Sequence, residues 1–469
     1  MYRFLLISND SLFVYYLLSN LINLALLIIA IYKNTLHRYR LASLRMESLA
    51  SPFAPPISLL VPAHNEELGI VANVRSLLRL DYAQLEVIVV NDGSSDKTLD
   101  VMRENFGLHR APIVYVSDIE TAPVMAIYRS ATHPRLLVLD KKSAGSKADA
   151  INAGINAATS PYVCVVDADS ILEKDSLSRI MAGVMLDPQR VIAVGGIVRI
   201  LNGSKVQNAE LKEVHLPHTH IEMLQVIEYL RAFLVGREAW AGFNLLPIIS
   251  GAFGIFRRDL LLKIQGFRAE AVGEDFDLIV RLHRYMHDHN LPYHINFIPD
   301  PTCWTEAPSD YRSLARQRAR WHKGLLDTLW ASRGMLFKKR YGRVGAVILP
   351  YMWLFECFAP ALEVVGYSTI ILAAVLGCLS HEFFVQFLLF GYAFATLISV
   401  GSVLLEELNY RRYGRWREVA WLLTYCLFEH LPYRQLTMIW RLRGMWEYLR
   451  GDVRWHELKR TGASASASA

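Results

Sequence analysis

Residues 162–170 read YVCVVDADS, a run of apolar and β-branched side chains that ends in two carboxylates, Asp167 and Asp169. Such a run predicts a buried strand, and the polar residues after it predict the turn that opens the next helix. Two interpretations are open at this point. The carboxylates bind a metal ion and a nucleotide, or they cap the following helix, as Asp and Ser often do.

The same design recurs three times upstream, in ISLLVPAHNEE (57–67), LEVIVVNDGSSDKT (85–98) and RLLVLDKKSAGSKADAINAGI (135–155). Each stretch is an apolar strand, a polar turn and a helix start. Repeated strand–turn–helix units predict an α/β fold with a mostly parallel sheet. In such sheets ligands bind in the crevice beyond the carboxyl ends of the strands, which is where these polar turns lie.

Further polar clusters should reach the same crevice. Asp92 lies in NDGSSD (91–96), Glu274 and Asp275 open the helical pattern of VGEDFDLIVRLHRY (272–285), and RQRARW (316–321) contains Gln317, Arg320 and Trp321. Acidic, basic and aromatic groups around one cleft predict a phosphorylated sugar donor bridged by a divalent cation. Mg²⁺ or Mn²⁺ is typically held by one or two carboxylates together with substrate phosphates.

Each cluster alone has an ordinary structural interpretation. NDGSSD is a turn and helix cap, GED is a helix start favoured by the helix dipole, and QRARW is a basic amphipathic helix that could lie on a membrane. Four such signals, placed at strand ends that should converge, favour the functional interpretation.

Composition predicts a soluble domain joined to membrane helices. The 469 residues are 53% hydrophobic, with a mean hydropathy of +0.22 and 20% charged residues. We expect a signal-anchor span at about 12–32 with a basic linker (1–48), a cytoplasmic domain (49–335) and a C-terminal membrane region (336–460). That region should hold spans at about 349–377 and 383–405 and a re-entrant or spanning segment at about 418–440, before a low-complexity tail (461–469).

Basic residues flank these segments, so the positive-inside rule places the domain in the cytoplasm, at a bacterial inner membrane. The net charge of +6 then fits anionic lipid, and no nucleic-acid-binding motif is present. Two amphipathic stretches, at about 221–240 and 310–330, are expected to lie at the membrane surface.

Taken in order, these motifs resemble those of the processive, membrane-embedded family-two glycosyltransferases, which include cellulose, hyaluronan and poly-N-acetylglucosamine synthases. The resemblance runs from about Ile57 to Trp330. It implies a glycosyltransferase A-type domain that binds a nucleotide sugar. It also implies inverting transfer from a UDP-sugar to a growing β-linked polysaccharide, with secretion of an exopolysaccharide of the poly-N-acetylglucosamine or glucan kind, as in biofilms.

The resemblance further implies a role for each motif residue. On the donor side, Asp92 would contact the uridine, Asp167 the nucleotide and Asp169 the metal ion, Mg²⁺ or Mn²⁺. Lys147 would support the nucleotide or diphosphate, and His64 to Glu66 would line the nucleobase side.

At the reacting centre, Asp275 would be the general base, with Glu274 beside it. Gln317 and Arg320 would hold the diphosphate or close the donor pocket, and Trp321 would stack on the acceptor sugar.

Two other functions stay open: transfer of a single sugar to a lipid acceptor, and a catalytically retired fold that serves as a membrane scaffold or receptor. With one predicted span before the domain, we expect an accessory export subunit or an oligomer to complete the channel. The histidines of HLPHTH (215–220) and the pair His283 and His287 are interpreted as surface or packing residues. Residues 117–135 are interpreted as an insertion or mobile loop.

Overall fold

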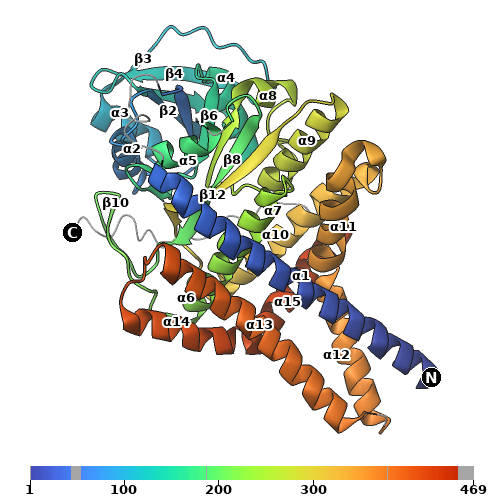
Figure 1. Cartoon of the computed structure of the whole chain (residues 1–469). Helices are drawn as coiled ribbons and strands as arrows, with labels where there is room; N and C mark the ends of the chain where they lie inside the picture. The colour runs from blue at the N-terminus through green and yellow to red at the C-terminus, as the bar shows by residue number, and fades with distance from the viewer. Residues whose placement is uncertain (1, 44–53, 186, 378, 453–469) are drawn as a thin grey trace.

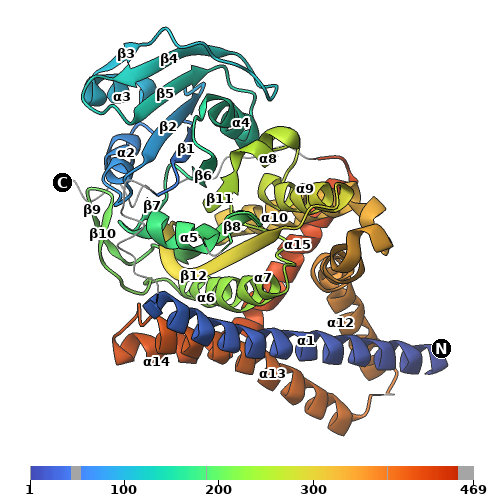
Figure 2. The ribbon, with the colours of Figure 1, turned by 45° about the horizontal axis from the view of Figure 1, so that its top comes forward.

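The computed structural model describes residues 2–43, 54–185, 187–377 and 379–452 (Figure 1). An α/β domain holds the sheet, and long helices from both ends of the chain pack together beneath it (Figures 1 and 2). The predicted low-complexity tail and the last part of the predicted linker, residues 44–48, lie outside the described residues.

A ten-stranded mixed sheet forms the centre of the α/β domain, in the order β3-β4-β5-β2-β1-β6-β11-β8-β12-β7. Strands β5, β2, β1 and β6 run parallel, whereas β4 and β11 are antiparallel to their neighbours. A separate hairpin consists of β9 and β10. The strands are β1 (Ile57–Ala63), β2 (Leu85–Asp92), β3 (Leu108–Arg110), β4 (Val124–Ser130), β5 (Leu136–Lys141), β6 (Tyr162–Val166), β7 (Ile171–Leu172), β8 (Val191–Ile200), β9 (Lys205–Gln207), β10 (Glu210–Glu213), β11 (Phe253–Arg257) and β12 (His294–Thr305).

The central strands are buried along nearly their whole length, which explains their continuous apolar runs. Helix α4 packs on β1 and β2 from the side opposite α2, and α5 packs on β8 and β12 (Figure 2). The domain helices are α2 (Ile70–Leu78), α3 (Thr98–Phe106), α4 (Lys147–Ala157), α5 (Ser176–Met185), α6 (His220–Leu230), α7 (Glu238–Gly242), α8 (Arg258–Lys263), α9 (Glu274–Asp288) and α10 (Tyr311–Ala331).

The prediction of a loop over residues 117–135 is wrong, because strand β4 lies within it. The segment before β4 is also attached to α4. The backbone N–H of Ile119 donates to Asn156 at 3.0 Å, and that of Ala122 donates to Asp149 at 3.0 Å. The alternating pattern of this strand is weak, with exposed side chains such as Met125, which is why the sequence did not reveal it.

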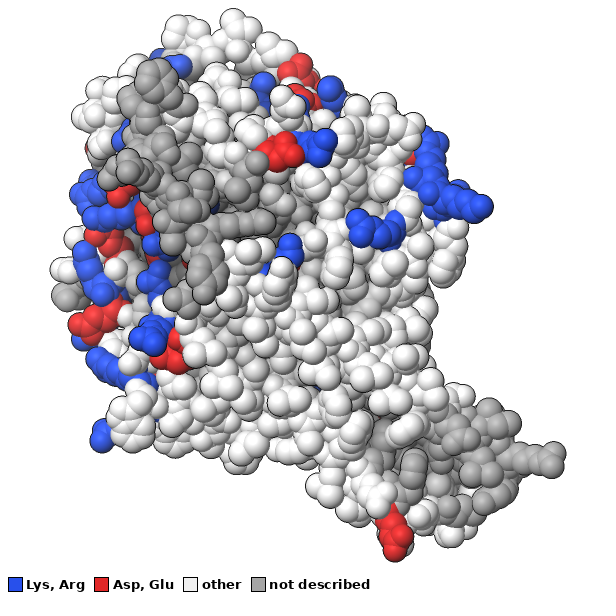
Figure 3. Space-filling model, in the orientation of Figure 1, with Lys and Arg blue, Asp and Glu red and all other residues white. Residues whose placement is uncertain are grey.

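Two helices in the described part of the chain are long and apolar enough to cross a membrane. They are Ser11–Leu36 within α1 (Tyr2–Ser43) and Phe384–Asn409 within α13 (His381–Asn409). The two run in parallel, because Leu27 meets Gly401 and the Tyr410 hydroxyl donates to Asn34 at 2.7 Å. Charged side chains gather over the α/β domain, and the face formed by the long helices carries almost none (Figure 3).

The segment predicted as one span at 349–377 is broken. Residues Val344–Cys357 and α12 (Ala359–Val375) meet at an angle of 46°, with α11 (Leu349–Tyr351) in the first part. Proline 360 at the start of α12 lacks an N–H, which favours a new helix there over a continuous one. The last segment comprises α14 (Trp416–Phe428), a π-helical turn and α15 (Arg434–Leu449), which packs along α10.

Candidate active site

Sheet topology places two of the predicted donor-binding residues, Asp92 and Asp167, at the carboxyl ends of nearby parallel strands, which we call the donor edge. Strand β2 ends at Asp92, and β6 ends directly before Asp167. Strand β1 lies between them and runs parallel to both, so β2 and β6 are two strand spacings apart, or about 10 Å. The predicted convergence of strand ends is therefore present.

Asp92 is 6% exposed, and polar neighbours hold its carboxylate. The Lys141 ammonium lies 2.8 Å from Asp92 Oδ1, and the Ser143 hydroxyl donates to Oδ2 at 3.2 Å. Lys141 is itself fully buried and also contacts Asp149 at 2.5 Å. Lys141 is a site residue that the sequence did not single out, although its place at the end of β5, beside Asp92, was a signal.

His64 and Glu66 lie in the turn after β1, which is locked to the turn after β2. His64 Nδ1 is 2.8 Å from the backbone oxygen of Asp92, and the N–H of Glu66 donates to the Thr98 hydroxyl at 2.8 Å. The Asn65 side-chain oxygen accepts from the N–H of Ser95 at 2.8 Å. These bonds fix the shape of the rim on the predicted nucleobase side.

Lys147 connects the two carboxylate clusters. Its ammonium forms an ion pair with Asp167 and donates to the backbone oxygen of Gly251 at 3.3 Å. Burial alone would lower the pKa of Lys147, but the charges of Asp167, Glu274 and Asp275 outweigh burial and raise it. This lysine therefore stays a cation between the strand edge and the start of α9.

Asp275 is oriented by backbone groups. Its Oδ1 accepts from the N–H of Phe276 at 2.8 Å, and its Oδ2 accepts from the N–H of Gly251 at 3.3 Å. A Cβ on Gly251 would stand 3.3 Å from the Lys147 ammonium and 3.6 Å from a Glu274 oxygen. Only a residue without a side chain leaves this space open, so Gly251 is a further site residue.

Glu274, the residue before Asp275, has a raised pKa. Burial raises its pKa, the charge of Asp275 raises it further, and the cations Lys147 and Arg320 oppose both. The opposition by Arg320 shows that α10 brings this arginine within electrostatic reach of the two carboxylates.

Helix α10 presents Gln317, Arg320 and Trp321 at i, i+3 and i+4, which is one side of a helix. Gln317 is 8% exposed, and its side-chain oxygen has no hydrogen-bond partner among the described residues. Trp321 is 45% exposed, and the Arg318 guanidinium lies 4.3 Å from its ring centroid. An orphaned amide oxygen and an open indole are groups that a polar ligand with an apolar face could satisfy.

Arg237 is a second cation near Asp275, and the sequence did not point to it. Burial lowers its pKa to about 10, and the Asp275 charge acts against that shift. Its guanidinium covers the Phe233 ring at 3.8 Å, and Nη1 is buried without a hydrogen-bond partner in the described part of the chain. The stretch around it was interpreted as a membrane-surface helix, which hid this role.

The donor edge offers a divalent cation only part of its ligand shell. No group of three or more His, Cys, Asp or Glu side chains that could hold a metal occurs in the described ranges. Asp169 and Asp167 are half-buried at the strand edge, and Asp167 already pairs with Lys147. Such a set fits a cation that takes one or two carboxylates from the protein and completes its shell with phosphates and water.

Two protein-family models match the part of the chain that contains these residues. The family model described as "Glycosyl transferase family 2" matches residues 58–264, and that described as "Glycosyl transferase family group 2" matches residues 162–441. The chain is 28% identical over 293 residues to the probable glycosyltransferase YdaM of Bacillus subtilis, covering 62% of this chain and 60% of that protein. It is 25% identical over 280 residues to a poly-beta-1,6-N-acetyl-D-glucosamine synthase of Staphylococcus epidermidis, covering 59% and 57%.

Among solved structures, the chain resembles a Pyrobaculum calidifontis mannosyltransferase in complex with GDP-Man and Mn²⁺. The TM-score is 0.49 and the identity 19%, over 88% of this chain and 99% of that one. The chain spans about 60% of the length of the curated relatives that it matches.

Proposed function

This chain belongs to glycosyl transferase family group 2, and from that premise we propose that it transfers sugar from a UDP-sugar to a growing β-linked polysaccharide. The observation that carries the proposal is the position of Lys147, which pairs with Asp167 at the donor edge and faces Glu274 and Asp275 at the acceptor side. Donor and acceptor groups thus meet around one half-buried cation.

The chemistry of the proposed reaction is a single displacement, in which an acceptor hydroxyl attacks the anomeric carbon and UDP leaves. Asp275 accepts the proton of that hydroxyl, because two backbone N–H groups hold its carboxylate in one orientation. Lys147 and Arg320 supply positive charge to the leaving diphosphate. Glu274 lies within electrostatic reach of both cations.

Donor recognition is assigned to the strand edge. Asp92, held by Lys141 and Ser143, contacts the uridine, and the interlocked turn of His64 to Glu66 borders the base. Asp167 meets the nucleotide. Asp169 would hold Mg²⁺ or Mn²⁺, which when bound stabilises negative charge on the diphosphate.

Acceptor recognition is assigned to α10. The indole of Trp321 is open enough to pack on the C–H face of a sugar ring. Gln317 on the same helix closes the donor pocket, where its unpartnered oxygen accepts a hydrogen bond from the donor. The neighbouring membrane helices support polymer export, with the catalytic domain on the cytoplasmic side of a bacterial inner membrane. The Staphylococcus epidermidis relative, whose name states a poly-N-acetylglucosamine synthase, supports a polysaccharide product.

A UDP-release assay on the purified full-length protein tests the proposal. UDP-N-acetylglucosamine, UDP-glucose, UDP-galactose and UDP-glucuronate are each supplied with Mg²⁺ or Mn²⁺, and products are sized by mass spectrometry. We expect UDP release from one donor, removal of activity by EDTA, and products of many sugars. If every product carries a single sugar on a lipid, the enzyme performs single transfer and the proposal of polymerisation is wrong.

A further inference from the structure

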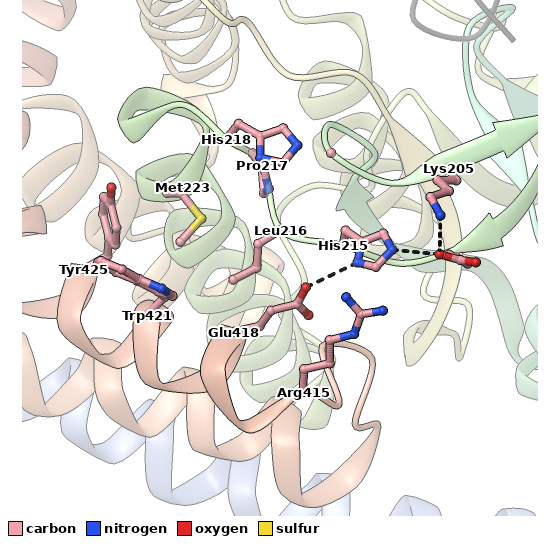
Figure 4. Close-up of a pocket in the computed structure, with 12 residues that line it drawn as sticks. Lys205, His215, Leu216, Pro217, His218, Met223, Arg415, Glu418, Trp421 and Tyr425 are labelled. Carbon is pink, nitrogen blue, oxygen red and sulfur yellow. Dashed lines mark hydrogen bonds and ion pairs between the residues drawn. The ribbon is translucent and has the colours of Figure 1, made fainter.

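A cavity of about 710 Å³ lies apart from the candidate active site, between the β9–β10 hairpin, the start of α6 and the first half of α14 (Figure 4). This volume is in the range of small-molecule sites. The segments around it are far apart in the sequence, and none of the residues assigned above to donor or acceptor lines it. The lining residues are Gly203, Lys205, Glu213, His215, Leu216, Pro217, His218, Met223, Arg415, Glu418, Trp421 and Tyr425.

The cavity has a polar end and an apolar end. Figure 4 shows Lys205, His215 and Arg415 on one side, with Met223, Trp421 and Tyr425 on the other. Polarity that changes along one cavity matches an amphiphile better than a uniformly polar metabolite.

The charges at the polar end are not equally available. His215 lies 2.9 Å from Glu213 and 3.3 Å from Glu418, and the Lys205 ammonium lies 2.9 Å from Glu213. These groups compensate one another and link the hairpin to α14. The Arg415 guanidinium has no side-chain partner among the described residues, so it is the cation left for an anionic ligand.

The cavity lies close to the end of a candidate membrane span. The candidate span in α13 ends at Asn409, and α14 begins at Trp416, with Arg415 directly before it. Trp416 is 75% exposed and Trp421 is 59% exposed. Arginine and exposed tryptophan at the end of a span are typical of the region of lipid headgroups.

From these observations we propose that the cavity binds a phospholipid of the cytoplasmic leaflet. Arg415 binds the phosphate, and the first part of an acyl chain lies along Trp421 and Tyr425. The bound lipid would then contact the β9–β10 hairpin and α14 together. This inference does not depend on the proposed sugar transfer, because lipid binding is measured without turnover.

The test uses the full-length protein in nanodiscs of phosphatidylcholine containing phosphatidylglycerol. After mild delipidation, the lipids that stay bound are identified and counted by native mass spectrometry. The variants are Arg415→Gln and, as a matched control from the same basic turn, Arg417→Gln, which does not line the cavity. We expect wild type to retain phosphatidylglycerol preferentially, Arg415→Gln to retain about fivefold less, and Arg417→Gln to match wild type.

A second variant, Trp421→Ala, tests the apolar end and is expected to lower retention of the lipid as well. Thermal unfolding confirms that each variant is folded. If Arg415→Gln and Arg417→Gln lose equal amounts of bound phosphatidylglycerol, the lipid responds to general surface charge and the proposed site is wrong. Displacement of the lipid by millimolar glycerol phosphate or inorganic phosphate would identify a soluble phosphate ligand instead, and would also overturn the proposal.

Discussion

The buried charges around Asp92 show how much a single lysine determines at the donor edge. Lys141 satisfies two carboxylates, Asp92 and Asp149, that would otherwise face each other in a dry environment. Removing one partner of a buried ion pair leaves uncompensated charge, which typically costs about 3–5 kcal/mol. The arrangement therefore stabilises the fold and holds the proposed donor site in place.

We expect Lys141→Met to lower the melting temperature by roughly 5–10 °C and to weaken UDP binding, because Asp92 loses its orientation. Lys142→Met is the matched control, since the neighbouring lysine is exposed. Differential scanning fluorimetry and UDP titration measure both effects. Similar melting temperatures and UDP affinities in the two variants would contradict the assigned role.

Glu274 gives a prediction about pH. Burial, aided by Asp275, raises its pKa above that of the unfolded chain. The folded protein therefore binds a proton that the unfolded chain has lost, and stability falls as pH rises from the ordinary carboxyl range through the raised pKa. Glu274→Gln removes this penalty.

The melting temperature of Glu274→Gln relative to wild type should accordingly increase as the pH is raised through that window, while its transferase activity falls. Asp259→Asn, an exposed carboxylate on α8, is the control and should show no such trend. Thermal unfolding in detergent from about pH 5 to about pH 8 measures the difference. A difference that does not change with pH would disprove the assignment.

At the scale of elements, α9 and α10 meet backbone to backbone. A Cβ on Gly324 of α10 would stand 2.8 Å from the Cα of Gly273, the residue before Glu274. The contact fixes the distance between the helix start that carries Asp275 and the helix that carries Gln317, Arg320 and Trp321. Small residues are needed at this crossing because the two backbones touch.

We expect Gly324→Ala to reduce the transfer rate by up to about 100-fold, because separating the helices misplaces acceptor and base. Helix propensity alone would favour alanine by about 1 kcal/mol, so lost activity cannot come from a weaker helix. Gly334→Ala, where a Cβ meets nothing within 4 Å, is the control. Equal kcat values for the two variants would show that the crossing does not position the site.

Strands that are continuous apolar runs and helices with clear start residues could be predicted from the sequence. Elements that depend on packing between distant segments could not. Buried strands such as β2 and β6 are continuous apolar runs, and the start of α9 follows from its acidic residues. The break before α12 and the π-helical segment ending at Arg237 depend on contacts between distant segments. Arg237 and Lys141 were missed for that reason, since each acquires its role only from a partner far away in the chain.

At the scale of the whole molecule, the α/β domain and the membrane helices are joined by buried ion pairs. Arg199 of β8 and Glu406 of α13 are 2.5 Å apart, and their side chains are almost fully buried. Arg199 also lies over the Trp304 and Tyr410 rings. The sequence showed a soluble part and an apolar part, but this attachment needed the structure, because an isolated arginine in a strand does not reveal its partner.

Comparison of wild type with Asp275→Asn in the UDP-release assay tests the central claim most directly. The substitution keeps the size of the side chain and removes the base, so the structure predicts unchanged folding, retained UDP binding and a loss of at least about 100-fold in transfer. Release of UDP by Asp275→Asn at the wild-type rate, with the same products, would contradict the account.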